Sequence, residues 1–369
     1  VANSVQQTTD GGYIVAGWTY TPGSAWQDVY VLKLNSKGDL EWQKTLGGGD
    51  HDVANSIQQT KDGGYVVAGW TKSSGSGWED VYILKLNSKG EVEWQKTFGG
   101  KGYDVANSVQ QTMDGGFIIA GVTKSIGFGA EDMYILKLNS KGDLEWQKTF
   151  GGKNNDGANS IQQTADGGYV VAGWTKSFGS GWEDVYILKL NSKGGVEWQK
   201  TFGRKYSDGA KSIQQTTDGG YIVAGWTESS PFEYYTDVYI LKLNLKGDLE
   251  WQKTFGGEDY DEANSVQQTT DGGYVFAGRT VSLGSADKDA CVLKLDSKGE
   301  ADTTPPELKF ISPSDGVELG GTIDINIDAK DNYELEKVTL YIDGKKVKEY
   351  TSGPYKYSWD SSKATEEGA

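Results

Sequence analysis

The feature that most constrains the fold of this chain is an internal repeat. The tripeptide Asp-Gly-Gly recurs with its aspartate at positions 10, 62, 114, 166, 218 and 271 of the 369 residues, at a spacing of 52 residues four times and 53 once. About 50 residues around each copy repeat as well, and the second copy reads ANSIQQTKDGGYVVAGWTKSSGSGWEDVYILKLNSKGEVEWQKTFGGKGYD. One unit of this kind cannot bury its apolar faces alone, so the units must pack on one another.

Each unit reads as four short β-strands. In the second unit we place them at residues 54–60, 64–71, 80–87 and 92–98, where Val, Ile, Tyr, Trp and Thr dominate. Asp-Gly-Gly and Asn-Ser-Lys-Gly turns separate them, and their glycines supply the positive φ that tight hairpins require. No window has a helical period, so the sequence predicts an all-β fold.

Four-stranded units of this length are typical of the blades of a β-propeller. In the second strand Val66 and Ala68 alternate with Tyr65 and Val67, so both faces of the blade are apolar, as expected between two neighbouring blades. The small, polar first strand fits the wall of a central channel, and the half-polar fourth strand fits the outer edge. There Val92, Trp94 and Phe98 share the packing side. We expect a closed disc; an open solenoid is the alternative.

The fourth-strand tryptophans alternate as core residues between blades: Trp42, Trp94, Trp146, Trp198 and Trp251. With these repeats, residues 1–299 resemble the Gly-rich propeller repeats of large secreted bacterial and archaeal proteins, which are kelch-like in architecture; the kelch signature is lacking. We therefore expect a six-bladed propeller. Its sixth unit runs at residues 297–300 into Ala-Asp-Thr-Thr-Pro-Pro without the Trp-Gln-Lys-Thr strand, which leaves 23 strands. We expect residues upstream of Val1 in the parent protein to supply the missing outer strand and close the ring.

After a linker at residues 300–306, the tail at 307–369 is a different module. Strands of period 2 at 322–329 and 337–342, with an Asp-Gly turn between them and the next strand, indicate a small β-sandwich. The tail resembles bacterial immunoglobulin-like surface domains. The residues that carry this resemblance are Ser312-Pro313, Asp315-Gly316, Asp331-Asn332, Tyr341-Ile342-Asp343-Gly344 and Trp359-Asp360. The last strands of such a sandwich are missing, so we expect a truncated domain whose exposed edge invites pairing with another chain.

The composition excludes several classes of function. With 36 Lys and Arg against 52 Asp and Glu, the net charge of −16 repels nucleic acid and anionic membranes. Apolar runs of about five residues are far too short to span a membrane. The single cysteine, Cys291, forms no internal disulfide and fits as a small core residue.

Catalysis has few residues to draw on. One histidine, His51, and two arginines, Arg204 and Arg279, rule out the arginine clamp of a sialidase and disfavour a His-based triad. Near-identical units also offer no asymmetric constellation, so we expect no enzyme. The enzymatic alternative that stays open is a carbohydrate-active enzyme with a carboxylate pair.

Two connections vary among the units, the one between strands two and three and the one between blades. In an antiparallel four-stranded blade both project from the same end, so we expect the variable loops to share one face, where binding usually resides. The aromatic residues on these loops are the candidate ligand-binding residues: Trp26, Trp78, Phe128, Trp182, Tyr235, Tyr103, Tyr206 and Tyr260, with Phe178, Phe232 and Tyr234 near them. The alternative is that Trp26, Trp78 and Trp182 fold back over their own blades.

Aspartates recur on the same loops, at the start of strand three and at the end of the inter-blade segment. Asp52, Asp80, Asp104 and Asp132 represent these positions and are the candidate Ca²⁺ ligands. Aspartates at loop ends more often accept hydrogen bonds from nearby backbone amides, so we expect an architectural role and no cofactor.

The sequence thus predicts a non-catalytic binding or adhesion module, extracellular or anchored at the cell surface. Its loop-bearing face would bind a polysaccharide or a surface protein. A structural subunit of a surface layer or filament is the alternative from another class.

Overall fold

The computed structural model describes residues 1–20, 25–228, 235–282, 288–301, 307–312, 322–330, 337–342 and 345–360. Contacts divide the chain into two compact units, one of residues 1–293 and 297–299 and one of residues 294–296 and 300–369. Every regular element in the described ranges is a β-strand, which confirms the all-β class.

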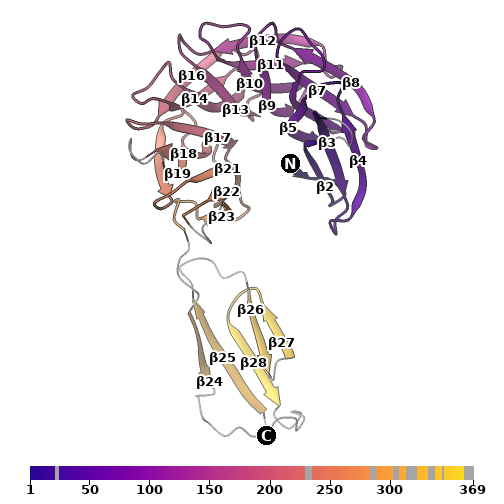
Figure 1. Cartoon of the computed structure of the whole chain (residues 1–369). Helices are drawn as coiled ribbons and strands as arrows, with labels where there is room; N and C mark the ends of the chain where they lie inside the picture. The colour runs from indigo at the N-terminus through magenta and orange to yellow at the C-terminus, as the bar shows by residue number, and fades with distance from the viewer. Residues whose placement is uncertain are drawn as a thin grey trace. The chain divides into compact units, whose positions relative to one another are not determined.

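Six antiparallel sheets follow one another along the first unit (Figure 1), and we call them blades 1 to 6. Blades 1 to 5 have four strands in chain order, and the described part of blade 6 has three, as the strand pattern predicted. The strands are β1 (Ala2–Gln7), β2 (Tyr13–Tyr20), β3 (Gln27–Leu34) and β4 (Leu40–Leu46) in blade 1; β5 (Asp52–Gln59), β6 (Tyr65–Thr71), β7 (Asp80–Leu86) and β8 (Val92–Phe98) in blade 2; β9 (Asp104–Gln111), β10 (Phe117–Thr123), β11 (Asp132–Leu138) and β12 (Leu144–Phe150) in blade 3; β13 (Asp156–Gln163), β14 (Tyr169–Thr175), β15 (Asp184–Leu190) and β16 (Val196–Phe202) in blade 4; β17 (Asp208–Gln215), β18 (Tyr221–Glu228), β19 (Thr236–Leu243) and β20 (Leu249–Phe255) in blade 5; and β21 (Asp261–Gln268), β22 (Tyr274–Thr280) and β23 (Asp289–Leu295) in blade 6.

Tight glycine turns join the strands within a blade. In blade 2 the first glycine after Asp62 and the glycine of Asn-Ser-Lys-Gly, Gly63 and Gly90, have φ of +81° and +76°. The Gly63 amide donates to Thr60 O at 2.9 Å, which closes the turn between β5 and β6. The conformation that the turn sequences predicted is therefore the one observed.

The apolar core lies between neighbouring blades. Val66 and Ala68 of β6 pack against blade 3, whereas Tyr65 and Val67 pack against blade 1, so both faces of the strand are buried as predicted. The fourth-strand tryptophans pack at the same junctions but are only partly buried: Trp94, for example, lies against Phe117 of the next blade. The blades are therefore held side by side chiefly by hydrophobic burial.

Val92 departs from its predicted position. It was expected to pack on the same side as Trp94 and Phe98, but it is 43% exposed. The register of β7 and β8 shifts between Lys85 and Leu86, so the alternation that holds at Trp94 does not extend to Val92. A bulge of this kind turns a side chain to the other face of its strand.

The first strands of neighbouring blades contact one another and line a polar cavity of about 270 Å³, as expected for the wall of a central channel. The cavity is lined by one glutamine from each of blades 2 to 6: Gln58, Gln110, Gln162, Gln214 and Gln267. Around it the blades form an arc (Figure 1). In the described ranges the strands of blades 1 and 6 do not pack together as neighbouring blades do. The structure does not confirm the closed ring of six.

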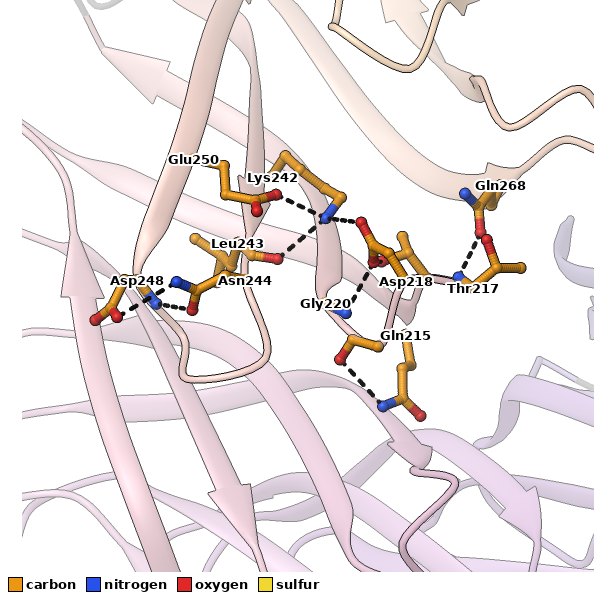
Figure 2. A network of polar contacts seen from close by, with 12 residues as sticks. Gln215, Thr217, Asp218, Gly220, Lys242, Leu243, Asn244, Asp248, Glu250 and Gln268 are labelled. Atoms are coloured by element: carbon orange, nitrogen blue, oxygen red, sulfur yellow. Dashed lines mark hydrogen bonds and ion pairs between the residues drawn. The ribbon is translucent and has the colours of Figure 1, made fainter.

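At the end of the blades that carries the invariant turns, a buried lysine of strand three ties the two turns together. Figure 2 shows it in blade 5, where Lys242 Nζ lies 2.8 Å from Asp218 Oδ2 and 2.9 Å from Glu250 Oε2 and donates to Leu243 O. The same contacts recur in blades 1 to 4 around Lys33, Lys85, Lys137 and Lys189. We call this end of the blades the turn face.

The second unit contains two small sheets (Figure 1). One has the order β24 (Glu307–Ser312), β25 (Thr322–Lys330), β28 (Tyr355–Asp360), and the other pairs β26 (Val338–Ile342) with β27 (Lys345–Tyr350). Ile325, Ile327 and Leu340 form their common core, so the two sheets pack as a sandwich. Seven residues quoted for the resemblance fall outside the described residues: Pro313, Asp315-Gly316, Asp331-Asn332 and Asp343-Gly344.

A candidate binding surface on the variable loops

The two variable connections lie against each other at the end of the blades opposite the turn face. The amide of Trp78, in the loop between β6 and β7, donates to Gly102 O at 3.2 Å, and the amide of Asp104 donates to Glu79 O at 2.7 Å. We call the surface that they form the loop face. It comprises residues 20, 25–27, 47–51, 72–79, 99–103, 124–131, 151–155, 176–183, 203–207, 235, 256–260, 281–282 and 288.

Buried aspartates hold these loops at their base. Asp80 Oδ2 accepts hydrogen bonds from the amides of Ser76 and Gly77 at 2.9 and 3.0 Å. Asp104 Oδ2 accepts from the Gly100 amide at 2.9 Å and from the hydroxyl of Ser125, in the loop between β10 and β11 of its own blade. Each aspartate thus replaces water as the partner of loop donors, two backbone amides for Asp80 and one amide and one hydroxyl for Asp104 Oδ2, which fixes the conformation of the loop.

The aspartates of neighbouring blades also come close in pairs. A Cβ on Gly99 would lie 2.5 Å from both Asp80 Oδ1 and Asp104 Oδ2, so the glycine separates the two carboxylates and admits no side chain. At the corresponding junction of blades 4 and 5, burial raises the pKa of Asp184, and burial together with the charge of Asp184 raises that of Asp208. The pair of Asp184 and Asp208 is therefore electrostatically costly, although each of its carboxylates also anchors a loop.

All four candidate Ca²⁺ ligands, Asp52, Asp80, Asp104 and Asp132, are buried at these positions. In each of them Oδ2 accepts from backbone amides, for Asp52 from the Gly48 amide at 2.8 Å, whereas Oδ1 of Asp52 and of Asp132 is buried without a hydrogen-bond partner among the described residues. A search of the described residues finds no group of three or more His, Cys, Asp or Glu side chains that would hold a metal ion. The arrangement fits the architectural role that was expected for these aspartates.

Large aromatic side chains project from the loop face. Trp78 is 80% exposed, Phe128 81% and Trp182 62%, so neither tryptophan folds back over its blade. Phe128 stands at the loop position that Ser76 and Ser180 occupy in the adjacent blades, two residues before the position of the tryptophans. Its ring therefore projects from a different point of the loop than the rings of Trp78 and Trp182. Three neighbouring blades thus each present an exposed aromatic ring, and blade 4 adds Phe178, which is 39% exposed and lies against Tyr186 with ring centroids 5.5 Å apart.

Other predicted aromatics are partly buried and brace the loops. Tyr103 lies beneath Lys124, whose Nζ is 5.4 Å from the ring centroid, and burial raises the pKa of its hydroxyl. Trp26 meets His51 edge-on with ring centroids 5.1 Å apart, and Tyr235 meets Tyr260 likewise at 5.8 Å.

Of the remaining predicted aromatic residues, the structure describes Tyr206. Tyr206 is half-buried, with Lys205 Nζ 5.6 Å from its ring centroid. Phe232 and Tyr234 lie outside the described residues.

Ion pairs stand between the exposed rings. Each loop of blades 2 to 4 begins with a lysine and ends with a glutamate, and the two pair at 3.0, 2.9 and 2.9 Å: Lys72 with Glu79, Lys124 with Glu131, and Lys176 with Glu183. These groups offer hydrogen-bond donors and acceptors beside an apolar ring. Aromatic and polar groups in this combination suit a ligand with apolar faces and a hydroxylated rim.

The interpretation of the sequence missed two exposed apolar residues of the loop face, Tyr20 and Ile126. Both lie in the variable connection between strands two and three, so their position carried the signal. Tyr20 was overlooked because it stands where other blades have the lysine of the ion pair, and Ile126 because only aromatic residues were considered.

The comparisons with known proteins bear first on the second unit. Residues 306–369 match the bacterial Ig domain family. The immunoglobulin-like resemblance of the tail is thereby confirmed. In the described part of the chain, no helix has the length and apolarity needed to cross a membrane.

A curated relative aligns with about two thirds of the chain. The chain is 23% identical over 286 residues to the regulatory protein FlaEY of Caulobacter vibrioides, an alignment that includes 67% of this chain. It spans only 29% of the length of that protein.

Solved structures that align with the chain include propellers. The β-propeller domain of the trilobed protease from Pyrococcus furiosus aligns over 89% of each chain with 10% identity and a TM-score of 0.44. The acylaminoacyl peptidase of Pyrococcus horikoshii aligns over 94% of this chain and 52% of its own, with 12% identity and a TM-score of 0.41.

Proposed function

We propose that the chain is a non-catalytic binding module of an extracellular or cell-surface protein and that the loop face binds a polysaccharide. The observation that carries the proposal is the row of unburied rings of Trp78, Phe128 and Trp182 on three consecutive blades. Solvent-exposed aromatic rings that no intramolecular packing requires are the usual anchors of a binding surface.

The repetition favours a polysaccharide over a protein partner. The loops of blades 2 and 4 differ at one position, KSSGSGWE against KSFGSGWE, so they present the same tryptophan twice, two blades apart. A ligand built from repeating sugars meets the same contact at each step, whereas a folded protein seldom presents the same patch twice. Two weak sites on one rigid scaffold also gain from effective concentration.

The bacterial Ig domain at residues 306–369 supports the location, because domains of this class are common in secreted and surface proteins. Several carboxylates of the loop face are poorly placed for catalysis: Asp80 and Asp104 are buried under the loops, and Glu79, Glu131 and Glu183 are paired with lysines. A structural subunit of a surface layer or filament is the second candidate. It draws on the same exposed rings of the loop face, which would then make the contacts between subunits.

The test is binding to an array of polysaccharides, with affinities from titration calorimetry for any that is retained. Trp78→Ala and Trp182→Ala should each weaken binding about tenfold, the loss of one stacking contact of about 1.4 kcal/mol. Met113→Ala and Leu245→Ala are the matched controls, because both are exposed apolar residues in turns of the opposite face. Equal affinities for all four variants would contradict the proposal. Ordered assembly without glycan binding would favour the structural subunit.

A further inference from the structure

The junction between blades has two distinct halves. The preceding blade contributes one face of its second and third strands, Val66, Ala68, Val81 and Ile83 in blade 2, and its fourth-strand tryptophan. The following blade contributes its first strand and the opposite face of its second and third strands. Four junctions bury the same positions in this way. Each end of the arc should therefore expose one of the two halves.

Blade 1 exposes the half that receives a preceding blade. Val5 is 66% exposed and Tyr13 37%, whereas their equivalents in blade 2, Ile57 and Tyr65, are buried against blade 1. Val15, Tyr30, Leu32 and Leu34 are likewise less buried than their counterparts in blade 2. An apolar face of this extent is costly to leave in water.

Blade 6 exposes the other half. Val292 is 72% exposed, whereas its equivalent in blade 2, Ile83, is buried against blade 3. Ala277 and Ala290 are exposed too, although Ala68 and Val81 at the same positions are buried. The two ends therefore carry complementary halves of one recurring junction.

Hydrogen bonds across the junctions are directional and identify the partner more closely than the apolar contacts do. Between blades 2 and 3, Ser56 Oγ accepts from the Val109 amide at 3.2 Å, and Gln58 Oε1 accepts from the Gln111 amide at 2.6 Å. A third bond runs in the opposite direction, because the Gln111 side chain accepts from the Lys61 amide at 2.8 Å. These three bonds recur at all five junctions.

This ladder of hydrogen bonds ends unpaired on both sides. In the described ranges, the amides of Val5 and Gln7 lack the serine and glutamine acceptors that their equivalents have, and Ser265 Oγ and Gln267 Oε1 lack the amides that would donate to them. The donors that blade 1 leaves free are the ones that a preceding blade of this sequence satisfies. The acceptors of blade 6 match a following blade in the same way.

Blade 1 also has an unfilled packing site for a fourth-strand tryptophan of a preceding blade, which we call the seat. At every internal junction a fourth-strand tryptophan lies between an aromatic ring and a turn glycine of the next blade; Trp42, for example, meets Tyr65 at 5.8 Å and Gly90. In blade 1 the corresponding residues are Tyr13 and Gly38. Nothing in the described ranges lies within 4 Å of a Cβ placed on Gly38. The occupant of this face must therefore carry a complete fourth strand.

We infer that the exposed faces of blades 1 and 6 seat a further complete blade of the same repeat, supplied by the same polypeptide ahead of β1. A second copy of this chain does not fit. In the described residues its blade 6 has no fourth strand, and so no tryptophan for the seat at Tyr13. In all five junctions, moreover, the preceding blade runs directly into the first strand of the next.

The experiment places a copy of residues 53–104 ahead of Val1, in the full chain. Val1 aligns with Val53 and Val105, so this addition continues the repeat in register. Hydrogen exchange of the Val5 and Gln7 amides should then slow at least tenfold, to the rates of Ile57 and Gln59. The same addition with the copied Trp94 and Gln58 changed to alanine is the control and should protect them much less.

Unchanged exchange at Val5 and Gln7 in the extended chain would overturn the inference, and circular dichroism shows whether the added repeat has folded. Val5→Asp tests whether protection comes from the junction itself. It should leave the melting temperature of the 369-residue chain unchanged, because Val5 is exposed there, but abolish the protection of both amides in the extended chain. Protection of both amides that grows with the concentration of the unextended chain, with association seen by sedimentation, would overturn it in favour of a second copy.

Discussion

Trp94 of β8 lies edge-on against Phe117 of β10, with ring centroids 5.6 Å apart and ring planes at 67°. The two residues belong to neighbouring blades, so this contact joins consecutive repeats. The same pair of positions recurs at the four other junctions, at 5.7 to 6.0 Å. An edge-to-face pair adds to the free energy already gained by burying both rings.

Trp94→Ala should therefore lower the free energy of unfolding by about 3 kcal/mol, the usual cost of deleting a large packed ring. Urea unfolding followed by far-ultraviolet circular dichroism measures the change. Trp78→Ala is the matched control, because Trp78 is exposed and its loss should alter stability by less than about 0.5 kcal/mol. Similar losses for the two variants would show that the junction ring is not a packing residue.

The buried lysine of the turn face yields a second prediction. Lys137 Nζ lies 3.0 Å from Asp114 Oδ2 and 2.9 Å from Glu145 Oε2 and also donates to Leu138 O. Lys137→Met keeps the apolar stem but leaves a buried carbonyl unpaired, so we expect a loss of about 2 kcal/mol in the free energy of unfolding. Lys141→Met, at an exposed turn position, should change it by less than about 0.5 kcal/mol. A neutral result for Lys137→Met would mean that the network contributes no net stability.

The same network predicts how stability depends on pH. Burial alone would raise the pKa of Asp114, but hydrogen bonds from Thr112, the Gly116 amide and Lys137 outweigh it and lower the pKa to about 2. Asp62, Asp166 and Asp218 in blades 2, 4 and 5 likewise have pKa values of about 2. The ordinary value is 3.8, so the folded state binds protons more weakly than the unfolded state.

The stabilisation is therefore fully present above about pH 4 and is lost as the pH falls from about 4 to about 2. Urea unfolding at steps between pH 6 and pH 2 should show this decline in the free energy of unfolding. Asp114→Asn removes one of the four groups and should make the decline shallower. An unchanged slope in this variant would contradict the assignment of the acid sensitivity to these aspartates.

Much of the fold could be predicted from the sequence, because comparing the repeated units shows which positions stay constant and which vary. The strands, the turn glycines and the two apolar faces of the second strand, such as Val66 and Tyr65, follow from local pattern and are observed. The prediction that Val92 packs beside Trp94 was wrong, because the register shift between Lys85 and Leu86 reverses the alternation of β8. Nothing in the apolar and polar pattern of the sequence indicates this bulge. The role of Lys137 was also missed, since a lysine in an apolar strand reveals its partners only when the turns are placed.

For the candidate site, the sequence predicted the shared face of the variable loops and the role of Asp80 as a loop anchor. It left the orientation of Trp78 open, because a tryptophan folded over its blade and one in solvent have the same spacing. The sequence also could not predict whether the blades close into a ring. Whether Val5 and Val292 meet a neighbour depends on the rotation at each junction, and that rotation is a property of packing rather than of periodicity.

Cys291 permits a test of how blade 6 adapted to its short sheet. The other five blades have a tyrosine at this position, whose hydroxyl donates to a fourth-strand glutamine, as Tyr82 does to Gln95 at 2.9 Å. Blade 6 has no such strand in its described part, and the smaller cysteine borders a cavity of about 110 Å³ that also touches Phe276.

Cys291→Phe should fill this cavity and raise the free energy of unfolding by about 1 kcal/mol, in the range found when cavities are filled. Cys291→Tyr should gain less, because its hydroxyl enters the same space without the glutamine acceptor that Tyr82 has. Urea unfolding of the two variants measures the difference. A tyrosine variant as stable as the phenylalanine variant would show that the hydroxyl reaches water, and that the missing acceptor does not explain the cysteine.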